Sequence, residues 1–175
     1  DCLLSRGLGD VYKRQVANRY LPESDHYRIV TLGAESLSVR ASNGIVMQAD
    51  QLAVDAPVAY DTLLVPGGPG AYNERHPHLY GWLREAAQAS RRHGAVCTGA
   101  FILGEAGLLD GHRVTTHWHY LDRLAKRFPK AQLETDLLFT KDGKLLSSGG
   151  VTAGIDLALS IPVSYTHLTL PTILL

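Results

Sequence analysis

The chain has 175 residues, with 17 basic and 17 acidic side chains and a formal net charge of zero. This length fits one domain of ordinary size, and a hydrophobic content of 45% is enough for a packed core. The neutral balance argues against a nucleic-acid-binding tail or a membrane-surface patch, and no apolar run is long enough to span a bilayer.

The two ends of the sequence differ from its middle. Residues 5–15 read SRGLGDVYKRQ, and residues 163–172 read VSYTHLTLPT. Back-translation of DVYKRQ as GAT GTG TAT AAG AGA CAG gives a reverse complement that encodes VSYTH in a shifted frame. Both ends also match adapters used with transposase fragmentation of DNA. We therefore expect residues 1–15 and 163–175 to be translated sequencing adapter, and residues 16–162 to be one domain that is cut at both ends.

Excluding the adapter removes Cys2 and leaves Cys97 as the only cysteine of the domain. A single thiol cannot form an internal disulfide, which is typical of a reducing compartment. We therefore expect a cytoplasmic protein.

Strand and helix patterns alternate along the domain. The predicted strands are 26–33, 61–70, 94–97 and 112–118, with hairpins at 38–48 and 137–150 that turn at Asn43-Gly44 and Asp142-Gly143. The predicted helices are 77–92, ended by His93-Gly94, then 98–107, 120–128 and one that begins at 152. This alternation favours an α/β domain with a doubly wound, mostly parallel sheet.

Parallel sheets of this kind bind ligands beyond the carboxyl ends of their strands. The two most glycine-rich strand exits are 66–70 and 97–99. We expect these two turns to lie side by side and to form the functional site.

Cys97 follows Ala95-Val96 with no turn residue between strand and helix. A side chain at such a junction is expected to project from the end of the sheet, above the start of the next helix. Backbone N–H groups there favour an anion, so they would stabilise a nucleophilic thiolate. The alternative is a buried, inert cysteine, which is the commoner state of a single thiol.

The glycine-rich turn offers backbone donors beside Cys97. The amides of Gly67, Gly68 and Thr98 are candidates to bind a ligand or an oxyanion. The turn is not a phosphate loop, because the lysine and hydroxyl residue of that motif are missing. The alternative is a tight turn with no ligand.

Three further residues are candidates. His117, at the exit of the next predicted strand, could take the proton of Cys97 or pair with its thiolate, although a surface or core histidine is an alternative. Trp118 could line a ligand pocket and Asp156 could orient a histidine, but core packing and an ordinary helix face are the favoured interpretations. One cysteine and scattered histidines predict no metal site, and no cofactor motif is found.

Four segments carry a resemblance to a known family: LLVPGGPG (63–70), VCTGAFILGEAGLLDG (96–111), VTTHW (114–118) and GGVTAGIDLAL (149–159). In this order and spacing they resemble the ThiJ/PfpI superfamily of flavodoxin-like, class I glutamine amidotransferase-like domains. By the resemblance, Cys97 matches the family's elbow cysteine, His117 its partner histidine, and Gly68 and Thr98 the donors around the thiol. The family's first strand and an acidic residue that polarises the cysteine fall before Val16, so the fold is expected to be N-terminally truncated.

Two branches of the family are similar. The GlxA-like, AraC-type transcription regulators use this domain to sense small amino-acid or amine derivatives, and bind DNA through a C-terminal helix-turn-helix domain. The isonitrile hydratases use the elbow cysteine to add water to an isonitrile. RFP (127–129) and Leu157 favour the regulator, whereas Gly149-Gly150 favours the enzyme. A stress-linked thiol sensor or glyoxalase-like enzyme is a third option. We favour the regulator, and the resemblance implies a homodimer that does not bind membranes.

Overall fold

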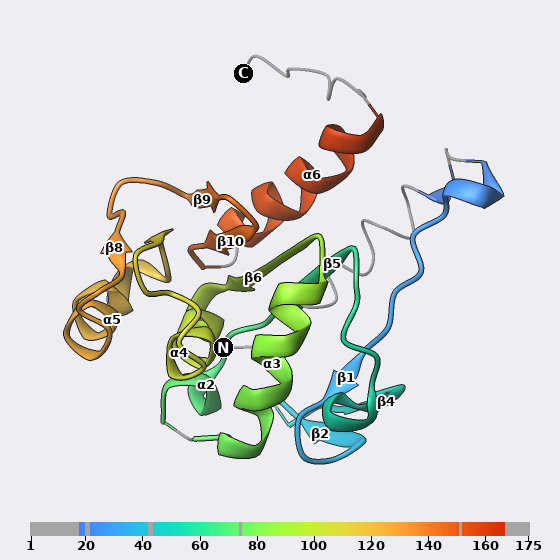
Figure 1. The fold of residues 1–175 in the computed structure, drawn as a ribbon, viewed down its shortest axis with the longest axis horizontal. Helices are drawn as coiled ribbons and strands as arrows, with labels where there is room; N and C mark the ends of the chain where they lie inside the picture. The colour runs from blue at the N-terminus through green and yellow to red at the C-terminus, as the bar shows by residue number, and fades with distance from the viewer. Residues whose placement is uncertain (1–17, 20–21, 42–43, 74, 151, 167–175) are drawn as a thin grey trace.

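The computed structural model describes residues 18–19, 22–41, 44–73, 75–150 and 152–166, with side chains as far as Ile161 (Figure 1). The expected N-terminal adapter at 1–15 lies outside the described residues, and so does Asn43 of the first predicted turn. The last helix, α6 (Thr152–Thr166), continues into the first residues of the expected C-terminal adapter, whose remainder from 167 on is also outside.

The main sheet has four strands in the order β5 (Thr62–Val65), β6 (Arg92–Val96), β10 (Leu145–Ser148) and β9 (Phe139–Asp142). Strands β5, β6 and β10 are mutually parallel, and only β9 pairs antiparallel, at one edge. The prediction of a mostly parallel sheet is therefore confirmed. Because β5 and β6 are parallel neighbours, their glycine-rich exits leave the sheet at the same edge.

Consecutive residues of the central strands enter different cores. Ala95 of β6 and Leu145 of β10 pack with helices α3 (Pro77–Ala89), α4 (Ala100–Glu105) and α5 (Leu121–Arg127). Their neighbours Val96 and Leu146 pack with α6 in a second cluster. Since adjacent strand residues point to opposite faces, helices cover both faces of the sheet, as the doubly wound prediction requires (Figure 1).

Short strand pairs surround this sheet. They are β1 (Leu32–Gly33) with β4 (Gln51–Leu52), β2 (Ser38–Arg40) with β3 (Val46–Gln48), and β7 (Arg113–Val114) with β8 (Gln132–Leu133). Both predicted hairpins are present, β2–β3 and β9–β10, and each turn places a glycine at positive φ, +87° for Gly44 and +58° for Gly143. Short 3₁₀ turns occur at η1 (Glu23–Asp25), η2 (Ala53–Asp55), η3 (Cys97–Gly99) and η4 (Trp118–Tyr120).

Several predicted boundaries were wrong. The expected strand 26–33 is reduced to β1, outside the main sheet, and helix α3 ends at Ala89. His93-Gly94, expected to stop that helix, lies inside β6 instead. The reason is contact with β10: a Cβ on Gly94 would lie 2.3 Å from the carbonyl oxygen of Leu146. Helix α2 (Pro69–Asn73) and strand β8 were not predicted.

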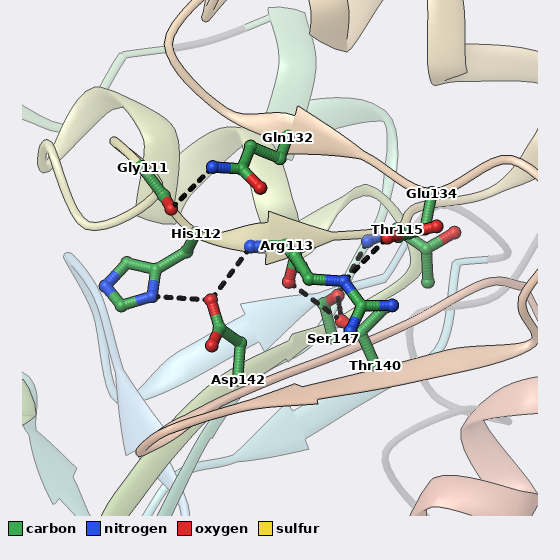
Figure 2. A network of polar contacts seen from close by, with 9 residues as sticks. All are labelled: Gly111, His112, Arg113, Thr115, Gln132, Glu134, Thr140, Asp142 and Ser147. Atoms are coloured by element: carbon green, nitrogen blue, oxygen red, sulfur yellow. Dashed lines mark hydrogen bonds and ion pairs between the residues drawn. The ribbon is translucent and has the colours of Figure 1, made fainter.

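A polar network fixes β7 against the β9–β10 hairpin (Figure 2). Asp142 accepts hydrogen bonds from the amide of Arg113 at 2.9 Å and from Nδ1 of His112 at 3.0 Å. These bonds, the Arg113 amide first, hold the pKa of Asp142 below its ordinary value. Deeper in the network, the amide of Thr115 donates to Ser147 Oγ at 2.7 Å. The network therefore sets where the chain leaves β7 and enters the candidate site.

Candidate functional site

Cys97 forms a sharp elbow between β6 and the following helical segment. It opens the 3₁₀ turn η3, which leads directly into α4. Its φ of +58° is the only positive value among the described non-glycine residues. Left-handed backbone is unfavourable for residues with a Cβ and concentrates at functional sites. The predicted turn between strand and helix is present, and its backbone is strained.

The thiol itself is buried. Cys97 is 1% exposed and packs with Val96, Leu146, Leu157 and Ile161, in the cluster beneath α6. The sequence left two alternatives, a thiol that projects from the end of the sheet and a buried one. The thiol is buried, because α6 packs over the elbow. Any reagent or ligand that reaches the sulfur must displace part of this cover.

The two glycine-rich turns lie side by side, as expected. The amide of Gly68 donates to Thr98 Oγ1 at 2.8 Å, and the same hydroxyl donates to the carbonyl oxygen of Gly68 at 3.1 Å. A Cβ on Gly67 would lie 2.5 Å from the amide nitrogen of Thr98, so only glycine fits there. The structure thus brings Gly67, Gly68, Cys97 and Thr98 together. The Gly68 amide is engaged by Thr98, so its predicted role as a ligand donor requires that bond to open.

His117 lies at the exit of β7, over the start of α6. Its Nδ1 accepts a hydrogen bond from the amide of His119 at 3.2 Å. A Cβ on Gly150 would lie 2.4 Å from Cδ2 of the His117 ring, so the ring rests directly against that glycine. Because Nδ1 acts as an acceptor, a neutral imidazole here carries its proton on Nε2. In that state Nε2 is a hydrogen-bond donor rather than a base.

A pocket of about 340 Å³ opens beside His117. Trp118, which is 75% exposed, stacks on the His117 ring with the ring centroids 5.6 Å apart. The pocket is lined by three segments, the last of which enters α6. The lining residues are Thr115, Thr116, His117, Trp118 and Leu121, then Thr135, Asp136, Leu137 and Leu138, then Gly149, Gly150, Thr152 and Ala153. This volume suits a small metabolite, and threonine hydroxyls, amides and one aromatic face surround it.

The predicted site residues therefore divide into two neighbouring groups. His117 and Trp118 line the pocket, whereas Gly67, Gly68, Cys97 and Thr98 form the elbow beside it. Thr116 links the groups, because it lines the pocket and its hydroxyl donates to the carbonyl oxygen of Cys97 at 2.7 Å. Asp156 is exposed on α6 and does not line the pocket, so its predicted role at the site stays a prediction.

A pair of tyrosines near the elbow was missed from the sequence. The hydroxyl of Tyr120 donates to that of Tyr72 at 2.9 Å, and their rings lie 4.6 Å apart. This hydrogen bond raises the pKa of Tyr120 above its ordinary value, and burial, Tyr72 and Cys97 add to the effect. Tyr72 and Tyr120 are 48 residues apart in the chain, and neither belongs to a pattern that could have identified the pair.

In the described part of the chain, no three His, Cys, Asp or Glu side chains lie together in a way that could hold a metal ion. Among the described helices, none combines the length and apolar character that a membrane span requires.

Comparisons with known proteins agree with the fold. The family described as DJ-1/PfpI matches residues 12–162. The HTH-type transcriptional regulator CdhR of Pseudomonas aeruginosa is 37% identical over 147 residues, which cover 84% of this chain and 43% of that protein. Isonitrile hydratase of Pseudomonas putida is 37% identical over 124 residues, or 70% of this chain and 53% of the enzyme. The chain thus spans about half the length of these relatives.

One solved structure extends the likeness of the fold. The crystal structure of an AraC family transcriptional regulator from Pseudomonas putida superimposes with a TM-score of 0.75, covering 92% of this chain and 83% of that one. Its sequence is 22% identical, so the likeness concerns the fold alone.

Proposed function

The chain belongs to the DJ-1/PfpI family, and we propose from this that it is the ligand-sensing domain of an AraC-type, GlxA-like transcription regulator. A small metabolite would bind in the pocket beside His117, next to the elbow cysteine Cys97. DNA would be contacted through a separate helix-turn-helix domain.

One observation carries the proposal: Thr116, which lines a pocket of about 340 Å³, donates a hydrogen bond to the carbonyl oxygen of Cys97 at the elbow. The pocket is bounded by the exits of β7 and β10, by the segment 135–138 and by the first turn of α6. Trp118 offers a flat apolar surface to such a molecule, and the His117 ring lines the same pocket. Neutral net charge suits a domain that does not itself bind DNA.

The relatives favour regulation over catalysis. CdhR and a second regulator from the same species, GbdR, match at 37% and 36% identity. Another HTH-type regulator, GlxA of Rhizobium meliloti, matches at 28%. In keeping with these relatives we propose a cytoplasmic homodimer.

The test uses the complete protein that contains this domain. The coding sequence downstream of Pro162 should encode a helix-turn-helix pair. Promoter DNA binding should respond to a metabolite added from a pool of amino acids and amines, and Cys97→Ser should abolish that response while DNA binding without metabolite persists. A complete protein that ends shortly after residue 162, or a response unchanged by Cys97→Ser, would contradict the proposal.

A second candidate is a cysteine-dependent hydratase of the isonitrile hydratase type. The strained backbone of Cys97 favours it, because a sharp strand-to-helix turn is a recurrent way to position a nucleophile. The burial of the thiol means that α6 would have to move aside to admit a substrate. Cys97 would attack the substrate, and the Thr98 amide would help to fix it. Release of an N-substituted formamide by the complete protein, lost in Cys97→Ser, would establish the enzyme.

A further inference from the structure

Thr116 stands between the pocket and the elbow. It is 2% exposed and follows Thr115 at the exit of β7. The hydroxyls of these two adjacent residues donate hydrogen bonds to different parts of the site. Thr115 Oγ1 donates to the carbonyl oxygen of Leu137 in the pocket wall at 3.4 Å, and Thr116 Oγ1 donates to the carbonyl oxygen of Cys97 at 2.7 Å.

The bond from Thr116 acts on the strained peptide of the elbow. Left-handed backbone at a residue with a Cβ costs about 1–2 kcal/mol and persists only where the surroundings hold it. The carbonyl of Cys97 is held from two sides, by the amide of Ala100 at the start of α4 and by the Thr116 hydroxyl. The donors come from different elements, so together they fix the peptide that follows the thiol.

The hydroxyl of Thr116, rather than its shape, makes this contact. Valine has nearly the same shape and would fill the same buried space, but it has no donor for the Cys97 carbonyl. Serine would keep the donor and lose only a methyl group. The position therefore allows the hydrogen bond to be separated from packing.

We propose that Thr116 is the positioning residue of the elbow, and that its hydroxyl holds Cys97 in the left-handed conformation that keeps the thiol buried beneath α6. The functional importance of this role rests on the proposed function, in which Cys97 is the central residue of the site. The bond also makes Thr116 the direct contact between the pocket and the elbow.

The test is the rate at which iodoacetamide alkylates Cys97 in the folded 175-residue chain. Mass spectrometry of the peptide that contains Cys97 separates its reaction from that of Cys2. Thr116→Val should raise the rate about tenfold, the factor that corresponds to loss of one hydrogen bond of ordinary strength. Thr116→Ser should restore the slow rate.

Ser90→Ala is the control. Ser90 is a buried residue whose hydroxyl donates to the carbonyl oxygen of Val58 at 3.3 Å and accepts from the amide of Tyr60 at 3.1 Å, outside the network that reaches Thr115 and Thr116. Its alanine variant should lose stability but leave the alkylation rate close to that of the unaltered chain. An unchanged rate in Thr116→Val, no recovery in Thr116→Ser, or an equal rise in Ser90→Ala would overturn the proposal.

If Thr116→Val does not fold, Thr116→Ser and Thr116→Ala make the same comparison, because they differ only in the hydroxyl. The alanine variant should then react faster than the serine variant, and equal rates would overturn the proposal. The reaction involves neither metabolite nor DNA, so its outcome is independent of whether the domain is a sensor.

Discussion

The hydroxyl of Thr98 forms two hydrogen bonds with the backbone of Gly68: it accepts from the amide at 2.8 Å and donates to the carbonyl oxygen at 3.1 Å. Both residues are buried, so neither bond is shared with solvent. These two hydrogen bonds join the exit of β5 to the elbow after β6, and they hold the glycine-rich turn against the backbone of Cys97 and Thr98.

Removing the two hydrogen bonds of the Thr98 hydroxyl should destabilise the fold. Thr98→Val leaves the buried amide of Gly68 without its partner, whereas the Gly68 carbonyl keeps the hydrogen bond from the Ala71 amide at 3.1 Å. The free energy of unfolding should fall by about 2 kcal/mol, since an unsatisfied buried donor costs roughly that much. Thr98→Ser keeps the hydroxyl and should lose much less. Urea unfolding followed by circular dichroism measures both changes, and a loss in Thr98→Ser as large as that in Thr98→Val would contradict the assignment of the effect to the hydroxyl.

A methyl group at Gly67 should also be poorly tolerated. Its Cβ would meet the amide nitrogen of Thr98 at 2.5 Å, so the two turns would have to separate. Gly67→Ala should lower the free energy of unfolding by about 2 kcal/mol. The control is Gly81→Ala in α3, where a Cβ meets nothing within 4 Å and alanine should stabilise the helix by about 0.5–1 kcal/mol. Unfolding curves that rank the two variants the other way would refute this packing.

The sequence predicted the elbow because strand and helix patterns meet at Cys97 with no turn residues between them. It predicted the adjacent glycine turn from the rule that parallel strands end at one edge. The sequence left burial of the thiol open, since it depends on where α6 lies over the sheet. The tyrosine pair is likewise a tertiary contact between residues far apart in the chain.

Local signals were misread where tertiary contact decided the role of a residue. His93-Gly94 has the composition of a helix stop, yet Gly94 is required by the close approach of Leu146 in the neighbouring strand. Helix α2 lies in a stretch of glycine and proline, which the sequence pattern identifies only as a turn. The resemblance placed His117 at the site, but only the coordinates show that Nδ1 faces the amide of His119.

His93 should make stability depend on pH. It is buried in β6 with its Nδ1 unpartnered, and burial, with smaller effects of His112 and Lys144, lowers its pKa. In the unfolded chain His93 binds a proton near pH 6.5, whereas in the folded chain it binds one only at lower pH. The free energy of unfolding should therefore fall as pH decreases from about 6.5 through the lowered pKa. Thermal unfolding between pH 7 and pH 5 measures the fall.

Replacing the residue identifies the source of this loss. His93→Gln should flatten the dependence over this range. The control is His78, which lies on the surface with its ring 3.9 Å from Glu35, so His78→Gln should leave the fall in place. Stability that falls equally in the His93→Gln variant would exclude His93 as the cause.

Two adjacent glycines should differ at the pocket. A Cβ on Gly150 would lie 2.4 Å from the His117 ring, whereas one on Gly149 makes only ordinary contacts at 3.5 Å or more. Because a ring can turn aside, Gly150→Ala should displace His117 without unfolding the domain, and Gly149→Ala should not. Ring proton and nitrogen NMR shifts of His117 report the displacement, and unchanged shifts in Gly150→Ala would contradict the arrangement.

The pocket beside His117, joined to the elbow by Thr116, is the centre of the proposed sensing site. The most direct measurement is amide NMR of the chain titrated with a pool of amino acids and simple amines. A binder should shift the amides of the pocket-lining residues 115–118, 135–138, 149–150 and 152–153, together with that of Cys97. Binding that shifts only the β2–β3 hairpin or α3, with these amides unmoved, would contradict the assignment of the site.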